Sequence, residues 1–447
     1  MTEPGAPRAS HVFSRAIGRE LPIADHAEGA WIVDAAGRRY LDAAGGAIVI
    51  GIGHGDAGVV EALAAQERRI AYAHGTAFTS EALEAYADEL APLLPVDEPR
   101  IYPVSGGSEA VETALKMARA YHLARGEASR HKVIARRASY HGNTVGALDA
   151  SGREALRRPY APWLGRALHV SPAYEYRCEN PDHPHGCGAR LAGELERAIL
   201  AEGPETVACF IAEPVSGATL GAAVPPDDYW PAVAQVCRRH GVLIIADEVM
   251  TGFGRTGRWF GVDHWDVRPD LMTLGKGTTS GYWPLGAAVA SGSVYEAIAA
   301  TGSFVHGFTF SHSAPGAAVA RAVLRRLREG NLVEASRDKG ELLRKLLVSE
   351  LADHPSVGDI RGLGLMVGVE LVADRATRAP LPRAERVTER VVAAARDRGL
   401  LLYSSTGCAD GTNGDLVMFG PPFVISDDDL GWAAATTREA LGAVGLG

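Results

Sequence analysis

Short runs of aliphatic residues, each bounded by glycine, proline or charged residues, recur through the middle of the chain. They lie at residues 100–104, 132–135, 206–212, 242–246, 271–274 and 285–290. Runs of this length are typical of buried strands, and near-continuous apolar character is typical of parallel sheets covered on both faces. The pattern therefore predicts an α/β fold whose central sheet is mostly parallel.

Amphipathic segments with helix-start signals alternate with these runs. We predict helices over 56–71, beginning at Asp56, over 80–94, beginning at Ser80, and over 110–126. Further helices are predicted from about 225–228 to 240 and over 317–329. Alternating strands and helices are the pattern of a large α/β domain, which we place at 56–330.

The character of the sequence changes near residue 330. Predicted helices at 332–350 and 383–398 alternate with short strands at 358–362, 366–371, 400–403 and 416–420. Near the N-terminus, residues 31–46 alternate and turn at Ala36-Gly37, which predicts a hairpin. We expect an N-terminal arm with part of a small domain at 1–55 and a small α+β C-terminal domain at 331–447, so that both ends of the chain build the small domain.

Composition narrows the function classes. The chain has 447 residues, 47% hydrophobic and 22% charged, and a net charge of −9, which is unlike a nucleic-acid-binding protein. No apolar segment is long enough to span a bilayer, and the N-terminus lacks the pattern of a signal peptide. Five scattered cysteines argue against a disulfide framework. We expect a cytoplasmic protein without nucleic-acid or membrane partners.

The candidate chemistry lies in residues 242–277, where two predicted strands end in reactive groups. One ends at Asp247 and Glu248, and the other is followed by Gly275 and Lys276. Ligands bind beyond the carboxyl ends of parallel strands, so both groups are expected to face one crevice. A lysine there can form a Schiff base and a carboxylate can hold a protonated ring nitrogen, the pairing that pyridoxal 5'-phosphate (PLP) requires.

A nucleotide-binding interpretation of the same stretch fails. The run IIADE resembles a Walker B strand, but a P-loop requires serine or threonine after its Gly-Lys pair. Here Gly277 follows Lys276, and Asp270 stands where the first glycine of the motif should be.

Two further motifs are ambiguous on their own. The turn around Gly107 and Ser108 joins a predicted strand to a helix N-terminus, which suits a phosphate group, although an ordinary turn with Ser108 as N-cap has the same pattern. Tyr140 and His141 follow another predicted strand end. The tyrosine could stack on a planar ring, but a loop histidine beside glycine is more often at the surface.

The loop CENPDHPHGC at residues 178–187 contains two cysteines and two histidines. Its spacing matches neither of the usual C-x₂-C and H-x₃-H pairs of zinc sites. We therefore interpret it as a polar excursion and predict no metal.

The blocks EVMTGFGRTG, PDLMTLGKG and YWPLGA resemble the signature of the class III (fold-type I) PLP-dependent aminotransferases, in particular the omega-transaminases. GGSEA, SYHGNT, IAEPVSG, IADEV and HGFTFS resemble other blocks of that family, in the same order, and the resemblance extends from LDAAGG to GPPF. It implies a large domain of the PLP-transferase type, a homodimer with shared active sites, and a soluble transferase acting on a small-molecule amino donor and a keto acceptor.

The resemblance also implies residue roles. Lys276 would form the Schiff base and act as general base and acid, and Asp247 would pair with the pyridine nitrogen. Val249 and Tyr140 would cover the two ring faces, with His141 beside them. Gly107 and Ser108 would hold the phosphate, together with Thr309 from the neighbouring subunit.

The sequence departs from the family at the substrate end. Many relatives that use α-keto acids carry a carboxylate-binding arginine shortly before the Pro-Pro block, but none lies between Tyr403 and Pro421, and Asn413 falls near that place. Glu213, which pairs with that arginine in some relatives, would need another role. Ile48 stands where amine-specific relatives often have an aromatic residue. We take Ile48 and Glu213 as candidate substrate residues.

These observations predict a ping-pong aminotransferase that moves an amino group between an amine or non-α amino acid and a keto acid or aldehyde. A decarboxylase, racemase or aminomutase on the same scaffold is the alternative. A non-catalytic PLP-fold protein is disfavoured, because Lys276, Asp247 and Tyr140 are all present.

Overall fold

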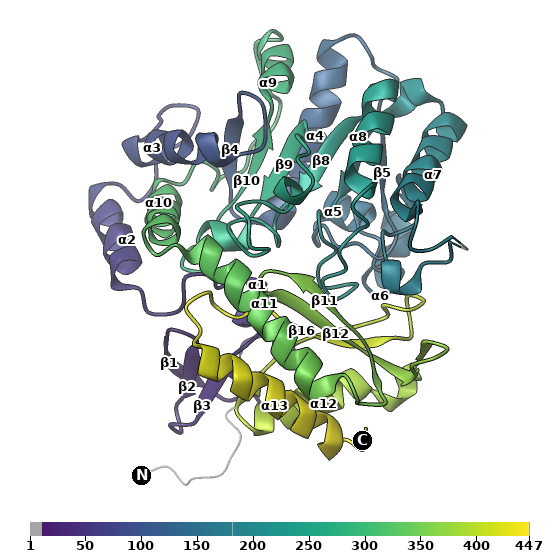
Figure 1. The fold of residues 1–447 in the computed structure, drawn as a ribbon. Coiled ribbons are helices and arrows are strands. Elements are labelled where there is room, and N and C mark those ends of the chain that lie inside the picture. The colour runs from purple at the N-terminus through teal and green to yellow at the C-terminus, as the bar shows by residue number, and fades with distance from the viewer. Residues whose placement is uncertain (1–10, 181, 447) are drawn as a thin grey trace.

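A seven-stranded sheet forms the centre of the larger part of the molecule (Figure 1). The computed structural model describes residues 11–180 and 182–446. In spatial order the strands are β4 (Arg100–Val104), β10 (Gly286–Ala290), β9 (Leu271–Leu274), β8 (Leu243–Asp247), β7 (Val207–Ala212), β5 (Lys132–Arg136) and β6 (Ala167–Val170). β10 runs antiparallel to β4 and β9, and the remaining neighbours pair in parallel. The predicted mostly parallel sheet is confirmed.

Helices cover both faces of this sheet, which explains why its strands are apolar throughout. In β7, Cys209 and Ile211 pack against α4 (Gly107–Ala124), α5 (Val145–Ala150) and α9 (Gly292–Ala299). The alternate residues Phe210 and Ala212 join the core formed with α7 (Cys187–Glu202) and α8 (Tyr229–His240). The two-residue period of a strand thus supplies a separate core to each face.

Side-chain caps fix the starts of several helices. α2 (Ala57–Arg69) and α3 (Glu81–Leu90) begin where predicted, with Asp56 and Ser80 each accepting a bond from a backbone N–H of the first turn. α10 (Ala314–Glu329) begins three residues earlier than predicted. Ser313 caps it by accepting from the N–H of Gly316 at 3.1 Å, and a proline is tolerated in a first turn.

The smaller part contains two sheets and the helices packed on them (Figure 1). Strands β2 (Trp31–Asp34) and β3 (Arg39–Asp42) form the predicted hairpin, and β3 pairs in parallel with β14 (Leu400–Leu401). N- and C-terminal segments therefore share one sheet. The domain boundaries at 55 and 330 remain predictions.

The remaining elements are as follows. The other strands are β1 (Ala24–Glu28), β11 (Val357–Leu363), β12 (Met366–Asp374), β13 (Ala379–Pro380), β15 (Tyr403–Thr406) and β16 (Asp415–Phe419). The other α-helices are α1 (Gly45–Ile48), α6 (Glu154–Arg157), α11 (Leu332–Leu351), α12 (Val387–Asp397) and α13 (Asp427–Ala443). The 3₁₀ helices are η1 (Ala91–Leu93), η2 (Arg158–Trp163), η3 (Glu175–Arg177), η4 (Pro204–Thr206), η5 (Gly261–His264), η6 (Lys276–Thr278) and η7 (Arg383–Glu385).

A buried arginine joins the two parts beside the candidate site. Arg255 donates to the backbone carbonyls of Leu365 (2.9 Å), Pro421 (2.7 Å) and Ile50 (2.9 Å). Burial lowers its pKa to about 9, and the three carbonyls provide acceptors for both terminal nitrogens. Among the described helices, none has the length and apolar character needed to cross a bilayer.

Candidate active site

A cavity of about 400 Å³ lies beyond the carboxyl ends of β8 and β9. Eight of the residues singled out from the sequence line it: Gly107, Ser108, Tyr140, His141, Glu213, Asp247, Val249 and Lys276. They come from five segments that are far apart in the chain. The parallel topology brings them to one edge of the sheet, as the strand-end argument predicts.

Asp247, the last residue of β8, is held by a network of hydrogen bonds. His141 Nδ1 lies 2.6 Å from its Oδ2, and Thr273 Oγ1 donates to its Oδ1 at 2.9 Å. The N–H of Val249 also donates to Oδ1, at 3.2 Å. Both Asp247 and His141 are almost fully buried, which fixes the carboxylate in one orientation. His141 is therefore no surface residue.

The position of His141 is fixed by a hydrogen bond of its own backbone. Its backbone N–H donates to Ser151 Oγ at 2.7 Å, and its Nε2 is buried without a hydrogen-bond partner among the described residues. An imidazole in contact with Asp247 and lining the cavity orients the carboxylate and supports its charge.

Lys276 follows β9 and opens η6 with a φ of 39°, which is rare for a residue other than glycine. Such strained conformations cluster at functional sites. Its amine has neither a hydrogen bond nor an ion pair with any described residue. Desolvation lowers the pKa of Lys276 to about 8, and outweighs the opposing attraction of Asp247 and Glu213. Near neutral pH a useful fraction of this amine is uncharged.

The glycine-rich turn leaves backbone groups free for an anion. α4 begins at Gly107 with Gly106 as its N-cap residue, so the alternative with Ser108 as N-cap is wrong. Ser108 lies inside the first turn, where its Oγ accepts from the N–H of Asn143 at 3.1 Å. The N–H groups of a first turn lack intrahelical partners and favour negative charge.

Small residues are required in this turn for different reasons. A Cβ on Gly107 would lie 2.8 Å from Val249 Cγ1, so glycine allows the valine to pack against the turn. A Cβ on Gly106 would meet nothing within 4 Å, which leaves space beside the free N–H groups. A phosphate group fits this cradle, and a planar ring fits between it, Asp247 and Lys276.

Glu213 lies directly after β7 and is buried. Desolvation raises its pKa, and its Oε1 accepts from the N–H of Gly217 at 3.2 Å. Arg136 Nη2 lies 3.7 Å from its Oε2 and donates to its backbone carbonyl at 2.6 Å. The partner of Glu213 is thus Arg136, from the neighbouring strand β5.

Two candidate residues lie away from the cavity. Ile48 is 2% exposed and packs in the core with Met366 and Met418, whereas the next residue, Val49, lines the cavity. The glycines at 45 and 46 have positive φ and kink α1, which shifts the register that placed Ile48 in the pocket. Thr309 is exposed and does not line the cavity.

Further lining residues are Val49, Ser105, Gly106, Gly142, Ala218, Met250, Thr279, Gly281, Trp283, Pro284 and Leu285. Several of them flank residues that the sequence motifs singled out. Thr273, which contacts Asp247 directly, was missed. It lies opposite Asp247 in the parallel register of β8 and β9, and only the register reveals it.

The chain matches the sequence profile of the family described as aminotransferase class-III over residues 14–441. It belongs to the class III aminotransferases. Members of this family depend on PLP, and the cradle, carboxylate and lysine of the cavity fit that cofactor. This protein is a PLP-dependent aminotransferase, and the comparisons do not favour the decarboxylase, racemase or aminomutase alternative.

Individual relatives agree with this assignment. The uncharacterised aminotransferase YodT of Bacillus subtilis is 37% identical, spanning 98% of each chain. A putrescine–pyruvate aminotransferase of Pseudomonas aeruginosa is 35% identical, covering 94% of this class III aminotransferase and 90% of its own length.

Solved structures are equally similar. An (S)-enantioselective omega-transaminase from Thermomicrobium roseum superposes with a TM-score of 0.89 at 38% identity, covering 95% of this chain and 93% of that one. An omega-transaminase from Pseudomonas jessenii, in complex with PMP, gives 0.89 at 34% identity with the same coverage. The predicted fold class and aminotransferase activity are confirmed.

Proposed function

We propose that this aminotransferase takes an amino group from a primary amine or a non-α amino acid and transfers it to a keto acid or aldehyde by a ping-pong mechanism. Relatives described as a putrescine–pyruvate aminotransferase and as omega-transaminases support this substrate class. The observation that carries the proposal is the lysine of lowered pKa beside a buried carboxylate, in a cavity lined without any arginine among the described residues.

When bound, PLP supplies an electrophilic carbon and an electron sink. Lys276, which lines the cavity, would hold the cofactor. Once the donor has displaced the lysine, its amine would move a proton between donor and cofactor. An amine of pKa about 8 can both accept and return that proton near neutral pH. Asp247, fixed by His141 and Thr273, would keep the ring nitrogen protonated, because a buried carboxylate favours a cation beside it.

The remaining roles position the cofactor. Val249 and Tyr140 would pack on the two ring faces, and the first turn of α4 at Gly107 and Ser108 would bind the phosphate. Packing on both faces would restrict the ring to one plane beside Lys276, the residue that would move the donor's proton.

The substrate end of the cavity is apolar. Val49, Met250, Trp283 and Leu285 form much of its wall. An α-carboxylate would be desolvated there without a guanidinium partner, which is costly. A donor with an uncharged group, or with its carboxylate farther from the amine, avoids that cost. We retain Glu213 as a substrate-side residue and replace Ile48 by Val49.

We also propose a cytoplasmic homodimer in which Thr309 reaches the phosphate of the partner's cofactor. Val305 and Phe310, in the same loop as Thr309, are 93% and 68% exposed. Exposed apolar side chains close together are typical of an interface. Mixing inactive Lys276→Ala chains with inactive Thr309→Asp chains should restore part of the activity, because each mixed dimer has one intact site. Failure to complement, despite subunit exchange, would contradict shared sites.

A half-reaction tests the substrate proposal. Holoenzyme is mixed with one donor at a time and without acceptor: an aromatic primary amine, putrescine, β-alanine and α-alanine. We expect stoichiometric conversion of the cofactor to its aminated form with the amines and β-alanine, and slower conversion with α-alanine. Preference for α-alanine would contradict the substrate class, and carbon dioxide release without the aminated cofactor would contradict transamination.

A further inference from the structure

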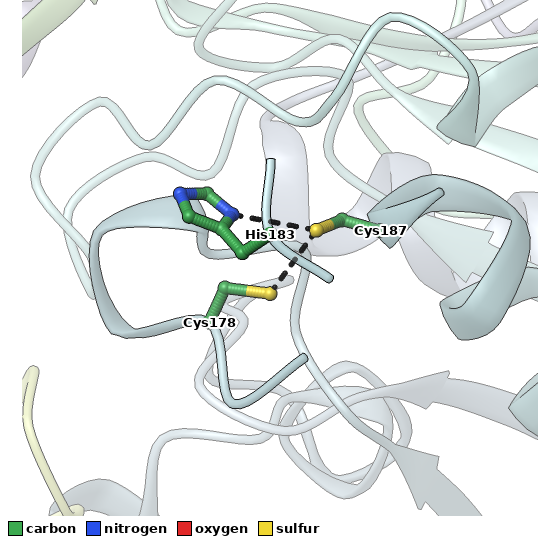
Figure 2. Close-up of side chains that lie close together, drawn as sticks. All are labelled: Cys178, His183 and Cys187. Atoms are coloured by element: carbon green, nitrogen blue, oxygen red, sulfur yellow. Dashed lines mark hydrogen bonds between the residues drawn. The ribbon is translucent and has the colours of Figure 1, made fainter. Parts of the chain in front are cut away.

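Three metal-binding side chains come together in the loop that precedes α7. Cys178, His183 and Cys187 each offer one ligand atom, and these atoms lie within 4.8 Å of one another (Figure 2). Cys187 Sγ lies 3.3 Å from Cys178 Sγ and 3.4 Å from His183 Nδ1. Figure 2 shows the Cys178 sulfur and the His183 imidazole both directed toward the Cys187 sulfur.

These separations suit a tetrahedral zinc ion. Bonds of about 2.3 Å to sulfur and about 2.0–2.1 Å to nitrogen place two sulfurs about 3.8 Å apart and a sulfur and a nitrogen about 3.6 Å apart. The two distances from Cys187 Sγ, 3.3 and 3.4 Å, are somewhat shorter, and the third pair lies within 4.8 Å, so that small side-chain rotations suffice to fit the ion. Two soft thiolates and an imidazole are a donor set that selects zinc over magnesium or calcium.

The surrounding loop holds the ligands in place. Cys187 is buried as the first residue of α7, and the next two N–H groups, of Gly188 and Ala189, donate to Asp228 at 3.1 and 2.8 Å. Asn180 Nδ2 donates to the carbonyl of His185 at 2.9 Å, which closes the loop around the cluster.

We propose that Cys178, His183 and Cys187 bind one zinc-type divalent ion. The neighbouring cavity, which Cys178, Cys187 and Glu175 line, would supply the fourth ligand. Water, or the Glu175 carboxylate after a side-chain movement, would complete the coordination. On binding, each thiol gives its proton to solvent, so that two thiolates and a neutral imidazole hold the cation.

The position of the cluster indicates a structural role. The segment leading into Cys178 bears Arg177, which donates to Glu370 of β12 at 2.9 and 2.6 Å, and Tyr174, which bonds the same carboxylate. A metal ion bound at the end of this segment would fix the segment to the smaller part of the molecule. The metal site itself lies apart from the Lys276 cavity. The inference is independent of the substrate proposed above.

Cobalt substitution tests the proposal on the full-length holoenzyme. Protein treated with chelator under reducing conditions is titrated with Co²⁺, and the visible ligand-field bands of tetrahedral cobalt are recorded. They lie to the red of the cofactor absorbance. Metal content is measured after Zn²⁺ addition and dialysis. We expect one tightly bound ion per chain, with Zn²⁺ displacing Co²⁺ and abolishing the bands.

The variants Cys178→Ser, His183→Asn and Cys187→Ser should each lose the bands and bound zinc. His185→Asn, which changes the other histidine of the same loop, should retain both. Absence of tetrahedral bands in the wild type overturns the proposal. Equal zinc retention by the cluster variants and the wild type also overturns it, as does a disulfide between Cys178 and Cys187 that resists reduction and prevents zinc uptake.

Discussion

The Lys276 cavity and the Cys178–Cys187 loop are built in opposite ways. The cavity gathers residues from strand ends, a helix start and the loops beside them, spread over residues 49–285. The loop gathers its ligands from a single segment between two helices. The topology of the sheet determines the positions of groups at strand ends. The geometry of a loop depends instead on contacts that the sequence spacing of its residues does not reveal.

Replacing Lys276 by alanine is expected to give the largest effect. Turnover should fall by a factor of about 10³ or more, because the variant loses both the attachment point of the cofactor and the group that moves the proton. Steady-state transamination and the visible spectrum of the cofactor-loaded protein measure the two losses. Lys116→Ala, which removes an exposed lysine of α4, is the matched control and should retain both. Retention of turnover by Lys276→Ala would remove this residue from the mechanism.

Asp247→Asn should reduce turnover by about 10²-fold, because an amide cannot stabilise a protonated ring nitrogen as a carboxylate does. The adjacent residue Glu248 is a buried carboxylate with a structural role, and serves as the comparison. Glu248 accepts from the N–H groups of Gly261 (2.8 Å) and Val262 (2.9 Å), and does not line the cavity.

Glu248→Gln should therefore retain turnover within a few-fold but lower the free energy of unfolding by about 1–3 kcal/mol, since an amide N–H₂ would face backbone donors. Kinetics and denaturant titration of both variants separate the two roles. If Glu248→Gln lost as much turnover as Asp247→Asn while remaining folded, the division between catalytic and structural carboxylates would be wrong.

The lowered pKa of Lys276 predicts a pH dependence. Only the neutral amine attacks the cofactor aldehyde, so incorporation into apoenzyme should rise about tenfold per pH unit below a pKa of about 8 and level off above it. Between about 8 and the ordinary lysine value, the unfolded state binds more protons, so apoenzyme stability should also rise with pH. Stopped-flow absorbance measures incorporation. A rate still rising steeply at pH 10 would show that burial does not lower this pKa.

Much of the large domain could be predicted, because its strands and helices carry strong periodic signals. The pairing of Asp247 with His141 could not, since 106 residues separate them and a Tyr-His-Gly loop has no pattern specific to this contact. Ile48 was misplaced because two glycines of positive φ kink the chain before it. α13 was not predicted, since its apolar positions are mostly small alanines that give little amphipathic signal.

The smallest expected effect on turnover belongs to the loop. Cys178→Ser should change turnover by less than about twofold, because its side chain faces a different cavity from that of Lys276. Its effect should appear in stability instead. An ion that binds only the folded chain stabilises it by mass action, about 2.7 kcal/mol at a hundredfold excess over its Kd. Zinc should therefore raise the thermal midpoint of the wild type by a few degrees and leave that of Cys178→Ser unchanged.

Both measurements are needed to maintain the contrast between the two sites. A parallel loss of turnover and zinc response in Cys178→Ser, with His185→Asn unaffected, would show that the loop acts on the Lys276 cavity. The two sites would then be coupled rather than separate. Unchanged turnover with a lost zinc response would show that the two sites act separately. Transamination would then depend on the strand ends, which the topology of the central sheet positions, and the loop would contribute only local stability.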